Sequence, residues 1–244
     1  MAPHPSHHPY RECWHGARDS LPMLVGAAPF GLIFGTLAGP AGLSPLATLT
    51  MSLFVFAGSS QFIAMTLVGG GASMAVIIMT TFIVNLRHAL YSASLLPHVR
   101  QLGQRWRLPL AFWLTDETYA VVQHRYGAAD ASPYKHWYYL GSCLAMYVNW
   151  AGWTLAGLLL GHAIPGVQGL GLEFAMAATF TGMVVPLLRQ RPMLAAALAA
   201  GLVALWAHSL PYKLGLMLAA LAGVITGLLV ERLCLAAQPR ETAP

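Results

Sequence analysis

The sequence predicts an all-α integral membrane protein, a polytopic helical bundle with a single transmembrane domain over residues 21–236. The chain has 244 residues, of which 57% are hydrophobic and only 9% are charged, and its mean hydropathy is +0.61. Soluble domains carry about 25% charged residues, so this chain could not cover itself with a water-compatible surface. Its apolar residues lie in runs long enough to span or enter a bilayer, and the segments between the runs are too short for a soluble domain.

The two ends of the chain are predicted to lie outside the bundle. Residues 1–20 are rich in proline and histidine and lack the apolar core of a signal peptide, which predicts a disordered tail. The alternative for this tail is a metal site built from His4, His7, His8, Cys13 and His15. A short second tail follows at 237–244. Because Cys13, Cys143 and Cys234 are far apart and form no CxxC pair, no disulfide, metal site or other cofactor is predicted.

The first apolar run, residues 21–38, has clear helix-start signals. Asp19 or Ser20 can cap the helix, and Pro22 fits the first turn, where its missing amide hydrogen is not needed. The run also carries small or kinking residues, namely Gly26, Pro29, Gly31 and Gly35. We therefore expect it to be either kinked or packed closely against a neighbouring helix.

The second run, residues 46–68, is interrupted by glycine and two serines at 58–60. Its two parts are each too short to span, since a crossing takes about 20 helical residues. The whole run either crosses the membrane or enters and leaves by the same face. Six further runs follow at 72–96, 109–123, 137–161, 172–188, 193–208 and about 214–235.

The distribution of basic residues favours the re-entrant alternative. If 46–68 and its counterpart 167–188 are re-entrant and the N-terminus is cytoplasmic, nine basic residues face the cytoplasm and three face outward, leaving Arg87 out. With eight full crossings, eight basic residues would face the cytoplasm and four would face outward. Cytoplasmic loops of membrane proteins carry an excess of Lys and Arg.

A gapless shift of the sequence by 121 residues aligns apolar runs with one another. It lays 21–38 on 142–159, 46–68 on 167–189 and 72–95 on 193–216. This match predicts two repeats, about 21–120 and 142–236, with the second inverted relative to the first and with broken or re-entrant helices, a common plan of transporters. The alternative is that apolar runs of similar length align by accident.

The segment "FAGSSQF" at 56–62 is the first place where polar residues interrupt an apolar run. A helix that starts at Gly58, Ser59 and Ser60 would point free amide hydrogens at one spot, which suits a carboxylate, and Gln61 adds a donor and an acceptor. The alternative is a serine-lined packing interface between helices.

The segment "NLRH" at 85–88 places Asn85, Arg87 and His88 in the middle of a run, with Tyr91 on the same helical stripe. Arg87 is long enough to snorkel to the interface, but Asn85 and His88 are not, so we expect them to face the protein interior.

The segment "LTDETYA" at 114–120 places Asp116 and Glu117 inside the predicted run 109–123. One of the two carboxyls is expected to pair with Arg87 or to take up a proton. The alternative is a structural ion pair between two helices.

Four segments in this order, "RDSLPMLVGAAPFGLIFG" at 18–35, "GSSQF" at 58–62, "NLRHALYSASL" at 85–95 and "LTDETYA", resemble the AzlC family of branched-chain amino-acid permeases. The resemblance covers roughly residues 16–235. It implies export of branched-chain amino acids across a bacterial inner (plasma) membrane, and a small membrane partner of the AzlD type.

The leading functional hypothesis is a secondary transporter that exports neutral apolar amino acids. The sequence has no nucleotide-binding P-loop, so an ion gradient would drive it. The predicted substrate-binding residues are Gly58, Ser59, Ser60, Gln61 and Asn85, and the predicted coupling or ion-pair residues are Arg87, His88, Asp116 and Glu117. Phe56, Phe62 and Met65 are expected to line an apolar pocket. Because the basic residues are scattered between apolar runs, no nucleic-acid partner is predicted.

Two other functional classes stay open. One is a channel or a structural subunit of a membrane complex. The other is an intramembrane serine protease that would use Ser60, the serine of a G-x-S match at 58–60, with His88 or His208 as the base. Gln61 stands where such a nucleophile loop expects a glycine.

Overall fold

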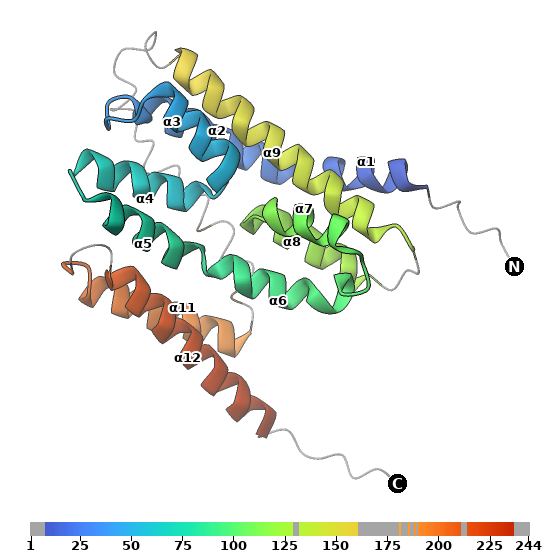
Figure 1. The fold of residues 1–244 in the computed structure, drawn as a ribbon. Helices are drawn as coiled ribbons and strands as arrows, with labels where there is room; N and C mark the ends of the chain where they lie inside the picture. The colour runs from blue at the N-terminus through green and yellow to red at the C-terminus, as the bar shows by residue number, and fades with distance from the viewer. Residues whose placement is uncertain are drawn as a thin grey trace, which may run out of the picture. The chain divides into compact units, whose positions relative to one another are not determined.

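The computed structural model describes residues 8–128, 132–160, 190–210 and 214–236, together with positions 181, 185 and 188. Every regular element among these residues is a helix (Figure 1). The chain forms two compact units, residues 1–172 and 173–244. The predicted all-α membrane bundle is confirmed: three helices of the described part are long and apolar enough to cross a membrane, Leu21–Ala38, Met74–Val99 and Lys135–Leu160.

The first unit is organised around α9 (Lys135–Leu160), against which both α1 (Pro9–Asp19) and α2 (Leu21–Ala38) pack. Glycines allow the helices to approach closely. A Cβ atom on Gly35 would lie 2.1 Å from the backbone oxygen of Thr154, and one on Gly157 would lie 2.1 Å from that of Leu32. The expected close packing of run 21–38 is therefore found, in the manner typical of membrane helices.

The helix α1 corrects the prediction of a disordered tail over residues 1–20. Gly16 and Gly141 bring α1 into backbone contact with α9, and the Glu12 carboxylate accepts hydrogen bonds from Arg125 at 3.0 and 3.1 Å. These tertiary contacts stabilise a helix that composition alone does not predict. Residues 1–7, which include His4 and His7 of the alternative metal site, and the second tail at 237–244 lie outside the described residues.

The helices α2 and α9 run in the same direction. Ser20 contacts Ser142, Leu24 accepts a hydrogen bond from Asn149, and Thr36 donates to Gly157, so contact positions increase together along both helices. An inverted second repeat beginning at about residue 142 requires these two helices to be antiparallel. The inverted orientation is therefore wrong for this pair, and most of the counterpart run 167–188 lies outside the described residues.

Hairpin A comprises α3 (Pro45–Thr50), a short π-helix η1 (Met51–Val55) and α4 (Gly58–Gly69). Its two ends meet at the C-terminal end of α2, since Cβ positions of Gly69 and Gly42 lie 3.7 Å from Ala41 and 3.8 Å from Val68. The chain thus enters and returns at one end of the unit, which is the arrangement of the re-entrant alternative for run 46–68.

The helices α5 (Met74–Asn85) and α6 (Arg87–Val99) form one long span with a break at Leu86. Hairpin B follows, made of α7 (Gln104–Phe112) and α8 (Asp116–Gly127). The prediction of one continuous helix over 109–123 is wrong, because the chain breaks at Trp113–Thr115. The sequence carried a signal for this break: Thr115 caps α8 by accepting from the Thr118 amide at 3.3 Å.

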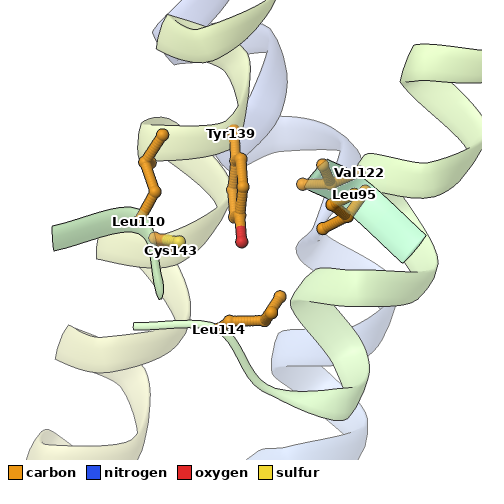
Figure 2. Packing of buried hydrophobic residues seen from close by; sticks show 6 residues of the cluster. All are labelled: Leu95, Leu110, Leu114, Val122, Tyr139 and Cys143. Atoms are coloured by element: carbon orange, nitrogen blue, oxygen red, sulfur yellow. The ribbon is translucent and has the colours of Figure 1, made fainter. Parts of the chain in front are cut away.

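Hairpin B packs through an apolar cluster that it shares with α6 and α9. In Figure 2, Tyr139 of α9 projects between Leu110 of α7 and the pair formed by Val122 of α8 and Leu95 of α6. Leu114 and Cys143 complete this cluster, in which every member is 2% exposed or less. Tyr126 near the end of α8 stacks on His98 near the end of α6, at 4.9 Å between ring centroids.

The two hairpins enter the first unit from opposite ends. Hairpin B opens where α6 ends and α9 begins, and hairpin A opens where α2 and α9 end (Figure 1). We call the first the basic end, because it holds Arg11, Arg18, Arg100, Arg105, Arg107, Arg125 and Lys135. The opposite, uncharged end holds no Asp, Glu, Lys or Arg among its described residues, since none occurs in 20–86 or 136–160.

The second unit contains two antiparallel helices, α11 (Arg191–Trp206) and α12 (Leu214–Ala236). They pack through small residues: Cβ positions of Gly215, Gly223 and Gly227 lie 2.3–3.2 Å from atoms of Ala207, Ala200 and Ala196. Their other faces expose large apolar side chains such as Leu202, Trp206 and Leu229, as helices in lipid do.

Candidate functional site

The tip of hairpin A is a strained break in the middle of an apolar segment. Phe56 has a φ angle of 43°, in the left-handed region that a bulky residue rarely adopts. Ala57 is extended, and α4 starts at Gly58 with no side-chain cap. The first-turn amides of α4, at Gly58, Ser59 and Ser60, therefore have no carbonyl of their own helix to pair with.

Polar side chains extend from this tip into the interior. The Gln61 side-chain amide donates to Ser52 Oγ at 2.9 Å, and Ser52 shares a hydrogen bond of 3.0 Å with Thr154 on α9. All three side chains are fully buried. The Ser60 hydroxyl donates to Asn85 Oδ1 at the end of α5. Two predicted site residues, Ser60 and Asn85, are thus in direct contact.

A second polar cluster lies at the tip of hairpin B. Asp116 accepts from Arg87 Nη1 at 3.0 Å and from the Tyr91 hydroxyl at 2.6 Å. Arg87 is held by this carboxylate, and its side chain is only 25% exposed. Tyr91 also stacks on Tyr119 of α8, at 4.5 Å between ring centroids. Of the two carboxyls suggested by the sequence, Asp116 is the one that pairs with Arg87.

Glu117 lies beside Asp116 in the first turn of α8, directly after the N-cap residue Thr115. Acidic residues in the first turn of a helix are stabilised by the free amides and by the helix dipole. The sequence interpretation placed both carboxyls inside a continuous helix, so it missed this role.

The two clusters meet at the break between α5 and α6. Asn85 belongs to the cluster of hairpin A, Arg87 belongs to that of hairpin B, and only Leu86 separates them. His88 follows directly, with its ring 6.0 Å from that of Tyr91. The structure therefore joins predicted positions 60 and 85 in one contact and 87 and 116 in another, while the Gln61 side chain bonds to Ser52.

Tyr147, near the middle of α9, joins the two tips. Its ring lies 5.0 Å from Phe56 of hairpin A and 5.7 Å from Trp113 of hairpin B, and its hydroxyl donates to the Leu53 carbonyl at 3.0 Å. One turn further along α9, the Trp150 ring lies 2.8 Å from the Cβ position of Gly58. Sequence reasoning missed these aromatic residues, because an aromatic side chain in an apolar run carries no distinguishing signal.

Buried polar atoms without a hydrogen-bond partner are concentrated at the hairpin tips and the α5–α6 break. Among the described residues that are not exposed, six buried side-chain atoms have no hydrogen-bond partner: Ser59 Oγ, Gln61 Oε1, Arg87 Nε, His88 Nε2, Trp113 Nε1 and Trp150 Nε1. All six belong to the hairpin tips, the α5–α6 break or the α9 residue packed on Gly58. Each such group costs about 1–3 kcal/mol when it stays unpaired. Their concentration indicates a site for a polar ligand.

Two predicted pocket residues lie elsewhere. Phe62 packs edge-on against Phe34 of α2 at 5.8 Å, and Met65 belongs to a buried cluster with Phe34 and Ala38. These side chains anchor hairpin A to α2, whereas Phe56 is at the tip. His208 is in the second unit, where its ring contacts the Leu205 carbonyl at 3.0 Å.

A cavity of about 420 Å³ lies at the basic end, at the base of hairpin B. It is lined by residues of α6, α8 and the start of α9, among them His98, Tyr126, Lys135 and His136. The hairpin separates this cavity from the two polar clusters at the tips.

A span-and-hairpin unit with broken helices and unpartnered polar groups at its centre defines a polytopic helical membrane protein. The AzlC protein family matches residues 22–164, and the chain belongs to this family. The family includes transport proteins, and no catalytic activity is indicated.

Three relatives illustrate the similarity. The inner membrane protein YgaZ of Escherichia coli (strain K12) is 28% identical over 88% of this chain and 87% of its own length. An uncharacterized membrane protein of Archaeoglobus fulgidus is 33% identical over 84% of this chain and 89% of its own. The branched-chain amino acid transport protein AzlC of Bacillus subtilis is 28% identical over 66% of this chain and 62% of its own. No solved structure matches the chain.

Proposed function

We propose that the protein exports branched-chain or other neutral apolar amino acids, driven by an ion gradient. The observation that carries this proposal is the set of six unpartnered polar atoms gathered where two hairpin tips and a broken span meet. The substrate class is supported by the name of the Bacillus subtilis relative, a branched-chain amino acid transport protein. A small AzlD-type membrane protein is the proposed partner.

The orientation follows from the charge distribution. All basic residues of the described first unit except Arg87 gather at one end, and the opposite end is uncharged. The positive-inside rule then assigns the basic end, with the N-terminus, to the cytoplasm. The relative in Escherichia coli is named an inner membrane protein, which supports the same location here.

The substrate is proposed to bind between the tips. The first-turn amides of Ser59 and Ser60 would hold its carboxylate, as helix N-termini do in transporters, and Gln61 and Asn85 would add hydrogen bonds. A carboxylate at the start of α8 would hold the ammonium group. Because Asp116 already pairs with Arg87 and Tyr91, Glu117 is favoured as the carboxylate that holds the ammonium group. His88 and Glu117 are the candidates for binding the coupling proton.

The hairpins would act as two gates to this centre. Hairpin A closes it from the uncharged end through the Ser60–Asn85 hydrogen bond, and hairpin B closes it from the basic end through the Arg87–Asp116 ion pair. Opening one gate at a time gives alternating access to a fixed site.

The test is efflux of labelled leucine, valine and methionine from cells, with and without this chain and its proposed partner. Replacing Gln61 or Asn85 by Ala should reduce efflux at least tenfold, because each removes a polar group of the proposed binding site. Thr66→Ala and Thr81→Ala are matched controls, since these hydroxyls bond only to carbonyls of their own helices. Normal efflux from both site variants would refute this site.

The same cells distinguish the alternatives. A channel would show flux that does not saturate and that needs no gradient of a second ion. A structural subunit would leave efflux unchanged when deleted but would dissolve its complex. A serine protease would need a base beside its nucleophile. The hydrogen-bond partner of Ser60 is instead the Asn85 side-chain amide, which cannot act as a base.

A further inference from the structure

Donors outnumber acceptors among the unpartnered atoms at the centre. Arg87 Nε, Trp113 Nε1 and Trp150 Nε1 can only donate, whereas Gln61 Oε1 can only accept. The Ser59 hydroxyl and the His88 ring nitrogen can do either. A ligand that satisfies this set must therefore present a strong acceptor group to several donors at once, and a carboxylate, with two oxygens and about four lone-pair directions, is such a group.

The two indoles lie on different elements, Trp113 on hairpin B and Trp150 on α9. Trp113 is at the tip of hairpin B, where its ring contacts Tyr147. Trp150 is three residues after Tyr147 on α9, on the same face of that helix, and its ring covers Gly58 at the first turn of α4. The Trp150 side chain is only 7% exposed, so its N–H group cannot be satisfied by bulk water.

We infer that Trp113 and Trp150 are carboxylate-binding residues of this transporter, and that their indole N–H groups hold the substrate carboxylate together with the first-turn amides of α4. This inference rests on the proposed transport function and extends its site to two residues on hairpin B and α9. It also explains Gly58: any side chain there would occupy the space of the Trp150 ring.

The arrangement has a mechanical consequence. A carboxylate bound by hairpin A through its amides and by hairpin B through Trp113 links the two gates. Both tips then close around the bound substrate, and release follows when one tip opens while the other stays closed.

The experiment measures binding of labelled leucine to the purified full-length protein in detergent, with leucinamide as the competing ligand that lacks the carboxylate. Trp→Phe keeps an aromatic ring and removes the N–H donor. Trp113→Phe and Trp150→Phe should each raise the Kd for leucine about tenfold, which corresponds to ~1.4 kcal/mol, and leave the Kd for leucinamide unchanged. Trp153→Phe, on the same helix but 41% exposed, is the matched control and should change neither Kd.

Unchanged leucine affinity in both Trp→Phe variants would overturn the inference and leave the proposed function standing. Equal losses for leucine and leucinamide would also overturn it, because they would indicate a packing role. Failure of the unmodified protein to bind leucine would overturn the proposed function and this inference with it. If one variant does not fold, the other and the ¹⁵N-indole resonances decide: leucine, but not leucinamide, should shift the N–H signals of Trp113 and Trp150.

Discussion

At the scale of single residues, the Arg87–Asp116 ion pair explains how a guanidinium group can lie in the middle of a membrane span. The two groups lie 3.0 Å apart, with Asp116 held from its other oxygen by Tyr91. A charge at membrane depth is costly unless it is paired, so each residue makes the other tolerable. The sequence could suggest this pair from two polar interruptions, but it could not choose between Asp116 and Glu117, because that choice depends on where α8 begins.

The pair predicts a coupled effect on stability. Arg87→Gln or Asp116→Asn alone should destabilise the protein by about 2 kcal/mol, because each leaves a partly buried charge without its opposite charge. The double variant should recover much of this loss, since it leaves two neutral amides. Thermal unfolding of the four proteins in detergent measures the coupling. Additive losses in the double variant would show that the two side chains do not depend on each other.

At the scale of elements, the two hairpins differ in how far the sequence indicated them. Run 46–68 could be suspected of re-entrance because Gly58, Ser59 and Ser60 interrupt it and because the count of basic residues favoured it. Run 109–123 was taken as one helix, although Thr115 followed by two acids is a helix-start signal. Hydropathy averaged over the run concealed that signal, since Leu114 and Tyr119 on either side keep the average apolar.

Hairpin B predicts the sidedness of its two ends. Gly103→Cys, before α7, and Ala128→Cys, after α8, should both react with a membrane-impermeant maleimide from the cytoplasmic face. Ser73→Cys, before α5, should react from the opposite face only. Both variants at 103 and 128 are at exposed positions, and a Cβ on Gly103 would meet nothing within 4 Å. Labelling of positions 103 and 128 from opposite faces would mean that 109–123 crosses the membrane.

At the scale of the whole molecule, composition alone determined the class: a chain with 9% charged residues belongs in a membrane. The four segments at 18–35, 58–62, 85–95 and 114–120 then indicated the AzlC family, which the comparison confirms. The repeat prediction was less successful, because apolar runs of equal length align whatever their direction. The direction of α9 is fixed by contacts such as Ser20–Ser142 and Thr36–Gly157, which no hydropathy pattern contains.

The central claim is that the hairpin tips enclose one substrate site that opens to either face in turn. Its most direct measurement is maleimide labelling of Ser59→Cys from each face of the membrane, in a protein whose native cysteines at 13, 143 and 234 are replaced. Adding Asp116→Asn, which weakens the gate formed by hairpin B, should raise labelling about tenfold from the cytoplasmic face only. Adding Asn85→Ala, which weakens the gate formed by hairpin A, should raise it about tenfold from the opposite face only. A tenfold change corresponds to ~1.4 kcal/mol for each gate. Leucine should protect the thiol from both faces. Equal effects of the two variants on both faces, or a thiol that leucine never protects, would contradict the account.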